Sequence, residues 1–133
     1  MYFRIDLSNG QAIYEQIAWQ LKFAVAKGVL RGGELVPSVR ELSRQITVNP
    51  NTVARAYREL QTDGVLEPVR GTGMRVTPAA VEQCQRERDQ LLHDRLARAL
   101  CDAHQAGVTT SAIKNQIDTL LQTLNSESEG DTP

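Results

Sequence analysis

Cysteine is scarce in this chain, and long apolar runs are absent. Cys84 and Cys101 are the two cysteines among 133 residues, too few for the disulfide framework of a small secreted domain. No apolar run approaches the ~20 residues that span a bilayer. The first ten residues, "MYFRIDLSNG", lack the basic start and apolar centre of a signal peptide. These absences predict a cytoplasmic protein with no membrane partner.

The chain also carries little net charge. Its formal charge is −1 at pH 7, which by itself disfavours a nucleic-acid-binding protein. Residues 1–78, however, hold ten Lys and Arg against seven Asp and Glu, a net of +3. Residues 79–133 hold five against nine, a net of −4. This division favours a mildly basic working domain followed by an acidic partner domain.

Two helices are predicted near the N-terminus. Apolar spacing from Ala12 indicates a helix that Gly28 ends. The stretch "SVRE" is typical of a capping box, in which Ser38 accepts a hydrogen bond from the third N–H and Glu41 reaches back. The short helix that follows is expected to reach about Gln45.

A third helix is predicted after the tight turn "ITV". Asn49 can serve as its N-cap, Pro50 as its first residue and Gly64 as its end. The apolar spacing gives it a buried face made of Val53, Ala56, Tyr57 and Leu60. The opposite side is polar and contains Asn51, Thr52 and Arg55.

A β-hairpin is predicted beyond the third helix. Two short β-prone runs flank residues 70–73, and Pro68 indicates an edge strand. Helix, helix, tight turn, helix and hairpin follow one another in the order of a winged helix-turn-helix. The predicted fold class is therefore mainly α with a small β-hairpin, with residues 1–78 as a DNA-binding domain.

Residues 79–133 are predicted to form a short two-helix dimerisation domain. One helix runs to about residue 106, Gly107 stops it, and Thr109 caps the last helix. Two helices of 55 residues cannot bury a stable core unaided, but a four-helix homodimer can. The tail from about 125 to 133 is polar and expected to be disordered. The predicted interface comprises Leu92, Leu96, Leu100, Ile113, Ile117, Leu120, Leu121 and Leu124.

The polar start of the third helix is suited to double-stranded DNA. The second helix of a helix-turn-helix enters the major groove with its N-terminal residues at base edges. Asparagine can pair with adenine, and threonine can offer a hydroxyl or contact a thymine methyl. Arg40 would face the DNA backbone near a helix N-terminus, which favours anions. The candidate DNA-binding residues are Ser38, Arg40, Asn49, Asn51, Thr52, Arg55, Arg70, Gly71, Thr72 and Gly73.

Alternatives to this interpretation remain open. Asparagine and threonine are common helix caps, and a winged helix can also serve as a protein–protein interaction module without specific DNA binding. Cys101 and His104 could supply two metal ligands, yet nothing near them in the sequence completes a site. We therefore expect no metal, no cofactor and no enzymatic activity. A redox role for either cysteine depends on surroundings that the sequence does not give.

The stretch "PSVRELSRQITVNPNTVARAYRELQTDGVLEPVRGTGMRV", residues 37–76, resembles the DNA-binding domain of GntR-type bacterial transcription regulators. The form "NPNTV…AYREL…G" resembles their YtrA branch. The resemblance implies a homodimer that represses transcription from a palindromic operator. It also implies that Arg40, Asn51, Thr52 and the wing at residues 71–73 lie at DNA. Many relatives have arginine in place of Pro50 and Ala54, so their base contacts do not transfer to this chain.

The resemblance also bears on the C-terminal half and on the turn. Many relatives have glycine where this chain has Thr47, which leaves the backbone of the turn open. GntR-type regulators usually sense a small molecule, but 55 residues cannot enclose a typical pocket of ~300 Å³ or more. Whether an effector exists is therefore left open. The YtrA branch implies control of a neighbouring ABC-transporter operon, and the short chain excludes the branch fused to an aminotransferase-like domain.

Overall fold

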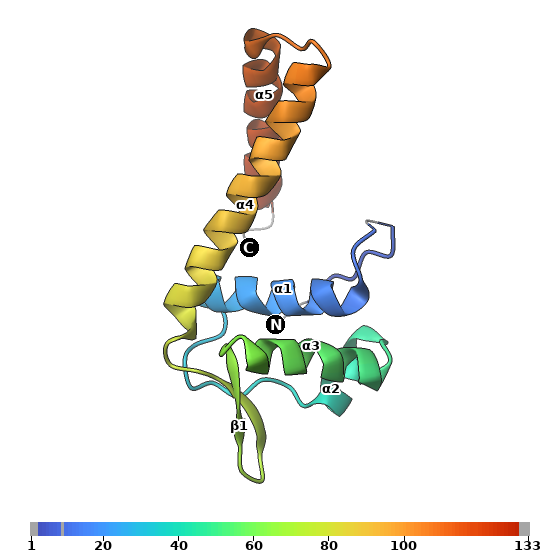
Figure 1. Cartoon of the computed structure of the whole chain (residues 1–133), viewed down its shortest axis with the longest axis vertical. Helices are drawn as coiled ribbons and strands as arrows, with labels where there is room; N and C mark the ends of the chain where they lie inside the picture. The colour runs from blue at the N-terminus through green and yellow to red at the C-terminus, as the bar shows by residue number, and fades with distance from the viewer. Residues whose placement is uncertain (1–2, 9, 131–133) are drawn as a thin grey trace. The chain divides into compact units, whose positions relative to one another are not determined.

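The computed structural model describes residues 3–8 and 10–130 of the chain, with the side chains of residues 128–130 left aside. Five helices and one hairpin follow one another along the sequence (Figure 1). They are α1 (Ile13–Lys27), α2 (Val39–Ile46), α3 (Pro50–Thr62), β1 (Leu66–Val69), β2 (Gly73–Val76), α4 (Ala80–Gln105) and α5 (Thr110–Gly130). The predicted fold class, a winged helix-turn-helix followed by two helices, is confirmed.

The helix boundaries follow from local capping chemistry, as the sequence predicted. Gly28 ends α1 in the left-handed conformation, with φ of 87°. Ser38 caps α2 by accepting a hydrogen bond of 3.1 Å from the Glu41 N–H. Asn49 caps α3 by accepting one of 2.8 Å from the Asn51 N–H, and Pro50 is the first helical residue.

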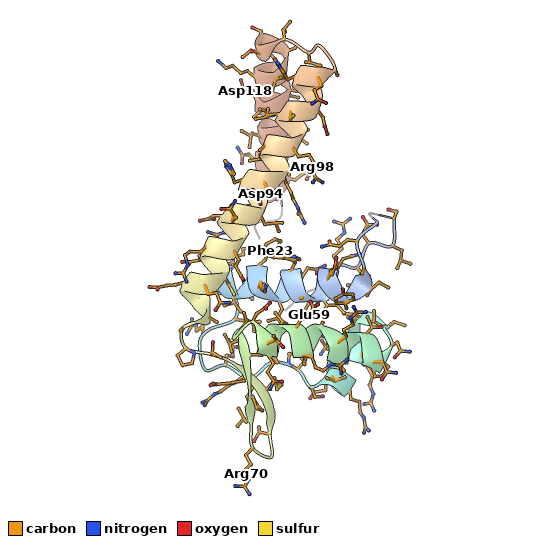
Figure 2. All side chains as sticks on the ribbon, viewed as in Figure 1. Phe23, Glu59, Arg70, Asp94, Arg98 and Asp118 are labelled. Atoms are coloured by element: carbon orange, nitrogen blue, oxygen red, sulfur yellow. The ribbon has the colours of Figure 1, made fainter. Side chains whose placement is uncertain are left out.

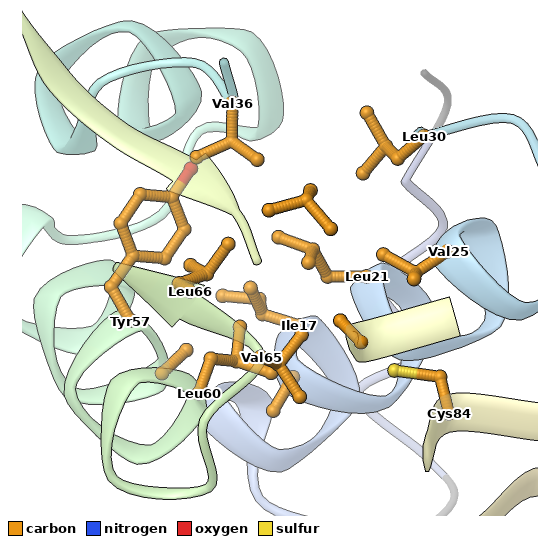
Figure 3. Packing of buried hydrophobic residues seen from close by; sticks show 14 of the residues in the cluster. Ile17, Leu21, Val25, Leu30, Val36, Tyr57, Leu60, Val65, Leu66 and Cys84 are labelled. Carbon is orange, nitrogen blue, oxygen red and sulfur yellow. The ribbon is translucent and has the colours of Figure 1, made fainter. Parts of the chain in front are cut away.

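The core of the first unit lies where α1, α3 and the hairpin meet (Figure 3). Ile17 and Leu21 of α1 are fully buried. The predicted buried face of α3 is confirmed, with Val53, Ala56, Tyr57 and Leu60 each at most 4% exposed. In Figure 1, α1 and α3 lie next to each other and the hairpin projects beyond them. The apolar positions at helical spacing thus enclose one core and leave the polar side of α3 outside it.

The hairpin is antiparallel and pairs Leu66 with Val76 and Val69 with Gly73. Pro68 stands on β1, which has β2 as its one neighbour in the described sheet. The loop before α2 runs along the other edge of β2, where the Val36 N–H donates to the Met74 carbonyl at 3.0 Å. This extra pairing ties β2 to the loop before α2, while β1 follows α3 along the chain, so both strands of the wing are joined to the helices.

The chain divides into two compact units after Gln90, beyond the change in composition at Pro78. The division lies within α4, and not at its start, because the first turns of α4 belong to the core of the first unit. Ala80 and Cys84 are fully buried there, and the Gln85 side chain donates to the Ala26 carbonyl at 3.2 Å. A helix that starts with mostly polar residues gives little sign of this packing in its sequence.

The second unit begins at Leu91 and contains the rest of α4 and α5. Among residues 91–127 no side chain is buried. The last helix continues to Gly130, so residues 125–130, predicted to be disordered, are helical because no breaker precedes Gly130. Residues 131–133 of the predicted tail lie outside the described residues. No helix in the described part of the chain combines the length and the apolar character needed to cross a membrane.

Candidate DNA-binding interface

The turn between α2 and α3 depends on Thr47. This residue adopts the left-handed conformation, with φ of 54°, and it is the one non-glycine residue with positive φ in the described chain. Two hydrogen bonds close the turn. The Ser43 hydroxyl donates to the Val48 carbonyl, and the Val48 N–H donates to the Ser43 carbonyl. Threonine therefore takes the backbone geometry that glycine supplies more easily, at a cost of about 1–3 kcal/mol.

The start of α3 is open to a ligand. Asn51 is exposed and Thr52 is half-buried beside it, while the cap residue Asn49 is also exposed. The first turn of α3 contains no acidic residue. Pro50 has no N–H and the Asn51 N–H is bonded to Asn49, so a ligand here would meet the polar side chains and the positive end of the helix dipole, which favours an anion.

Tyr57 fixes the start of α2 to α3. Its ring lies in the core, as predicted, and its hydroxyl donates to the Pro37 carbonyl at 2.6 Å. Burial, with a smaller effect of the Glu41 charge, raises the pKa of Tyr57, so the hydroxyl stays protonated and remains a donor. This bond ties Pro37, which directly precedes the cap residue Ser38, to α3. It therefore fixes the backbone at the start of α2, which carries the exposed Arg40, relative to the start of α3, which carries Asn51.

Arg55 lies against α1. Its guanidinium carbon is 3.8 Å from the centre of the Tyr14 ring, a stacked cation–π contact. The Tyr14 hydroxyl in turn donates to a Glu15 carboxylate oxygen at 3.2 Å. Sequence spacing grouped Arg55 with Asn51 and Thr52, but it gave no sign of a contact with an aromatic residue of another helix.

The wing presents an exposed tip at residues 70–73. Arg70 projects from the end of the hairpin (Figure 2). Gly71 and Gly73 have φ of 77° and 131°, values that residues with a side chain rarely adopt. Behind the tip, the Arg75 side chain donates to Glu67 on the facing strand at 2.6 Å. Arg75 is thus paired within the wing, whereas Arg70 and Thr72 are left exposed at its end.

The two cysteines lie in different surroundings. Burial raises the pKa of the Cys84 thiol to about 11, the opposite of what activates a cysteine. Cys101 is exposed on α4. In the part of the chain that the structure describes, no group of three or more His, Cys, Asp or Glu could hold a metal ion.

Comparisons with known proteins match this arrangement. The family model of bacterial regulatory proteins, gntR family, matches residues 13–76. The chain is 39% identical over 105 residues to the HTH-type transcriptional repressor YtrA of Bacillus subtilis, covering 79% of this chain and 81% of that protein. This chain belongs to the GntR family. It is a transcriptional regulator with a winged helix-turn-helix DNA-binding domain and is similar to YtrA.

Solved structures agree with the family assignment. A GntR-family transcriptional regulator from Listeria monocytogenes superposes with a TM-score of 0.70 at 27% identity, over 85% of this chain and 98% of the other. YtrA from Sulfolobus acidocaldarius, a GntR-family transcription factor, superposes with a TM-score of 0.56 at 33% identity, over 74% and 97%. The similarity therefore includes helices beyond the winged helix-turn-helix of this GntR regulator.

Proposed function

We propose that this GntR regulator is a cytoplasmic repressor that binds a palindromic operator as a homodimer. The observation that carries the proposal is the acid-free start of α3, where the exposed Asn51 and the half-buried Thr52 lie beside the helix cap. A helix start of this kind can enter the major groove and offer short polar side chains to base edges. Arg40 on α2 and the wing tip at residues 70–73 would contact the phosphate backbone on either side.

The homodimer is supported by the second unit. Seven apolar side chains of α4 and α5 are 40–62% exposed, although they share helical spacing. They are Leu92, Leu96, Leu100, Ile117, Leu120, Leu121 and Leu124. Ile113, the eighth residue of the predicted interface, is half-buried. Because no side chain of residues 91–127 is buried within one chain, these helices need a partner surface, and a second copy supplies the same stripe.

Repression is supported by the relative from Bacillus subtilis, which is called a transcriptional repressor. The YtrA-like sequence further suggests that the target is an operon for an ABC transporter. A palindromic operator follows from the homodimer, because two-fold symmetry of the protein requires two-fold symmetry of the site. The half-site centres should then be about one helical turn, ~10 bp, or a multiple of it apart.

The test is to select duplexes from a random-sequence pool with the full-length protein. We expect an inverted repeat that is also present upstream of the regulated operon. Footprinting on that region and sedimentation of the complex would then show two copies bound per operator. Enrichment of no sequence would contradict specific DNA binding and favour a protein–protein interaction module. A single copy bound to one half-site with full affinity would contradict the homodimer.

A further inference from the structure

We propose that Arg58 of α3 binds a DNA phosphate at the edge of the groove that this helix enters, and that Arg55 is instead a structural residue held by α1. The inference rests on the proposed DNA binding and adds a contact that sequence spacing did not indicate. It follows from which residues of the first unit contact each side of α3.

Three sides of α3 have different surroundings. The first is the core side, which contains Val53 and Leu60. The second faces α1 and carries Arg55, stacked on Tyr14. Glu59 belongs to this second side, since it lies between α1 and α3 in Figure 2 and its charge acts on the Tyr14 hydroxyl.

The third side of α3 makes no ring contact or ion pair with the described residues, although Ala54 on it is half-buried. Asn51, Ala54 and Arg58 occupy positions i, i+3 and i+7 on it, so they form one stripe along the helix. Arg58 is exposed, and its side chain makes no hydrogen bond or ion pair with any described residue, Glu59 included. This stripe therefore offers an unpaired positive charge in line with the residue proposed to contact bases.

The dimensions of the stripe suit a major groove. Seven residues of helical rise place Arg58 about 10 Å further along α3 than Asn51. The groove is about 12 Å wide, so a helix that reads bases with Asn51 brings Arg58 to the phosphates at its edge. Ala54 lies between them, and its small side chain lets the helix approach the DNA closely. A guanidinium is also the side chain best suited to a phosphate, with which it can form two parallel hydrogen bonds.

Arg55 is drawn toward α1 by its stack on Tyr14. Moving the guanidinium off the ring to reach DNA would lose this contact. It also joins α1 to α3 at the helix that carries Asn51 and Thr52. In place of the DNA contact predicted from the sequence, the proposed role of Arg55 is thus to support the orientation of α3 in the free protein as well as in the bound one.

The experiment uses the full-length chain and two duplexes, one selected by the wild-type protein from a random pool and one unselected duplex of equal length. Fluorescence anisotropy at a series of KCl concentrations measures affinity and its salt dependence. Arg58→Ala should weaken binding roughly tenfold on both duplexes, since a hydrogen-bonded charge pair is lost. It should also lower the slope of log K against log salt by about 0.9 per bound copy. Arg58→Lys should retain most of the slope, and the exposed Arg98→Ala on α4 is the matched control.

Arg55→Ala should lower the melting temperature and leave the salt slope unchanged. The proposal is overturned if Arg58→Ala retains both affinity and slope, or if it changes the preferred sequence without changing the slope. It is also overturned if Arg55→Ala lowers the slope instead. If the wild-type protein selects no sequence, the proposed sequence-specific binding is contradicted. The Arg58 proposal is still tested in that case, because Arg58→Ala should lower the salt slope on the unselected duplex as well.

Discussion

Replacing Leu120 tests the homodimer most directly. The side chain is 62% exposed in one chain, and full burial of a leucine stabilises by about 1.5–3 kcal/mol. Covering the exposed part in an interface therefore contributes about 1–2 kcal/mol per copy, or about 2–4 kcal/mol for a symmetric pair. Leu120→Ala should then raise the dimer dissociation constant about 30- to 700-fold. Leu120→Asp should do more, because an unpaired charge at such an interface is costly.

The assay is sedimentation velocity over a range of concentrations, together with binding to the selected duplex. Leu120→Asp should sediment as a monomer and bind weakly, with little sequence preference. Gln122→Asp is the matched control, since it places the same charge on α5 at an exposed polar position. Leu96 has the same exposed fraction as Leu120, so Leu96→Ala should give a similar loss. A Leu120→Asp protein that remains a dimer, or a control that dissociates equally, would refute the reasoning.

Four further predictions concern the first unit. Asn51→Ala should cost about 1–3 kcal/mol of DNA-binding free energy and relax sequence preference in each half-site. Arg40→Ala should instead weaken binding to all duplexes and reduce the salt slope. Equal effects of the two substitutions on sequence preference would contradict these roles. Gly71→Val should reduce affinity more than thermal stability, while Gly71→Asn, which tolerates the observed φ of 77°, should retain binding. Thr47→Gly should raise the free energy of unfolding by about 1 kcal/mol in urea titrations, because it relieves the left-handed threonine; no gain would mean the turn is unstrained. The unfolded chain loses the Cys84 proton near its ordinary pKa of 9.0, but the folded chain retains it up to a pKa of about 11, so unfolding at pH 10 should need about 1 kcal/mol less than at pH 8, a loss that Cys84→Ala should reduce.

Sequence reasoning succeeded where the determining interactions are local. Ser38 and Asn49 cap helices by bonding to N–H groups two or three residues away, and Gly28 ends a helix through its own backbone conformation. Such signals lie within a few residues and can be read directly. The core side of α3 was equally accessible, because helical spacing alone decides which residues share a face.

The candidate site was harder to predict because its contacts join distant parts of the chain. Nothing near Arg55 indicates that Tyr14 of α1 would stack on it, so spacing alone grouped it with Asn51. Nor does local sequence reveal that Tyr57 donates to the Pro37 carbonyl and thereby fixes the start of α2. These contacts depend on how helices pack, and that packing determines which arginine is free to bind a phosphate.

The boundary of the first unit has the same kind of origin. Lys22 of α1 is 8% exposed, and its amino group lies 3.0 Å from Asp63 at the end of α3 and 3.2 Å from Glu87 of α4. Burial alone would lower the pKa of Lys22, but the hydrogen bond that its amino group donates to Asp63 and the charge of Glu87 outweigh it and raise the pKa. A buried lysine without both carboxylates would be costly, so the ion pairs specify which helices meet here. The start of α4 therefore joins the DNA-binding unit through charge pairing as well as through Cys84, and a change of composition at Pro78 could not reveal either.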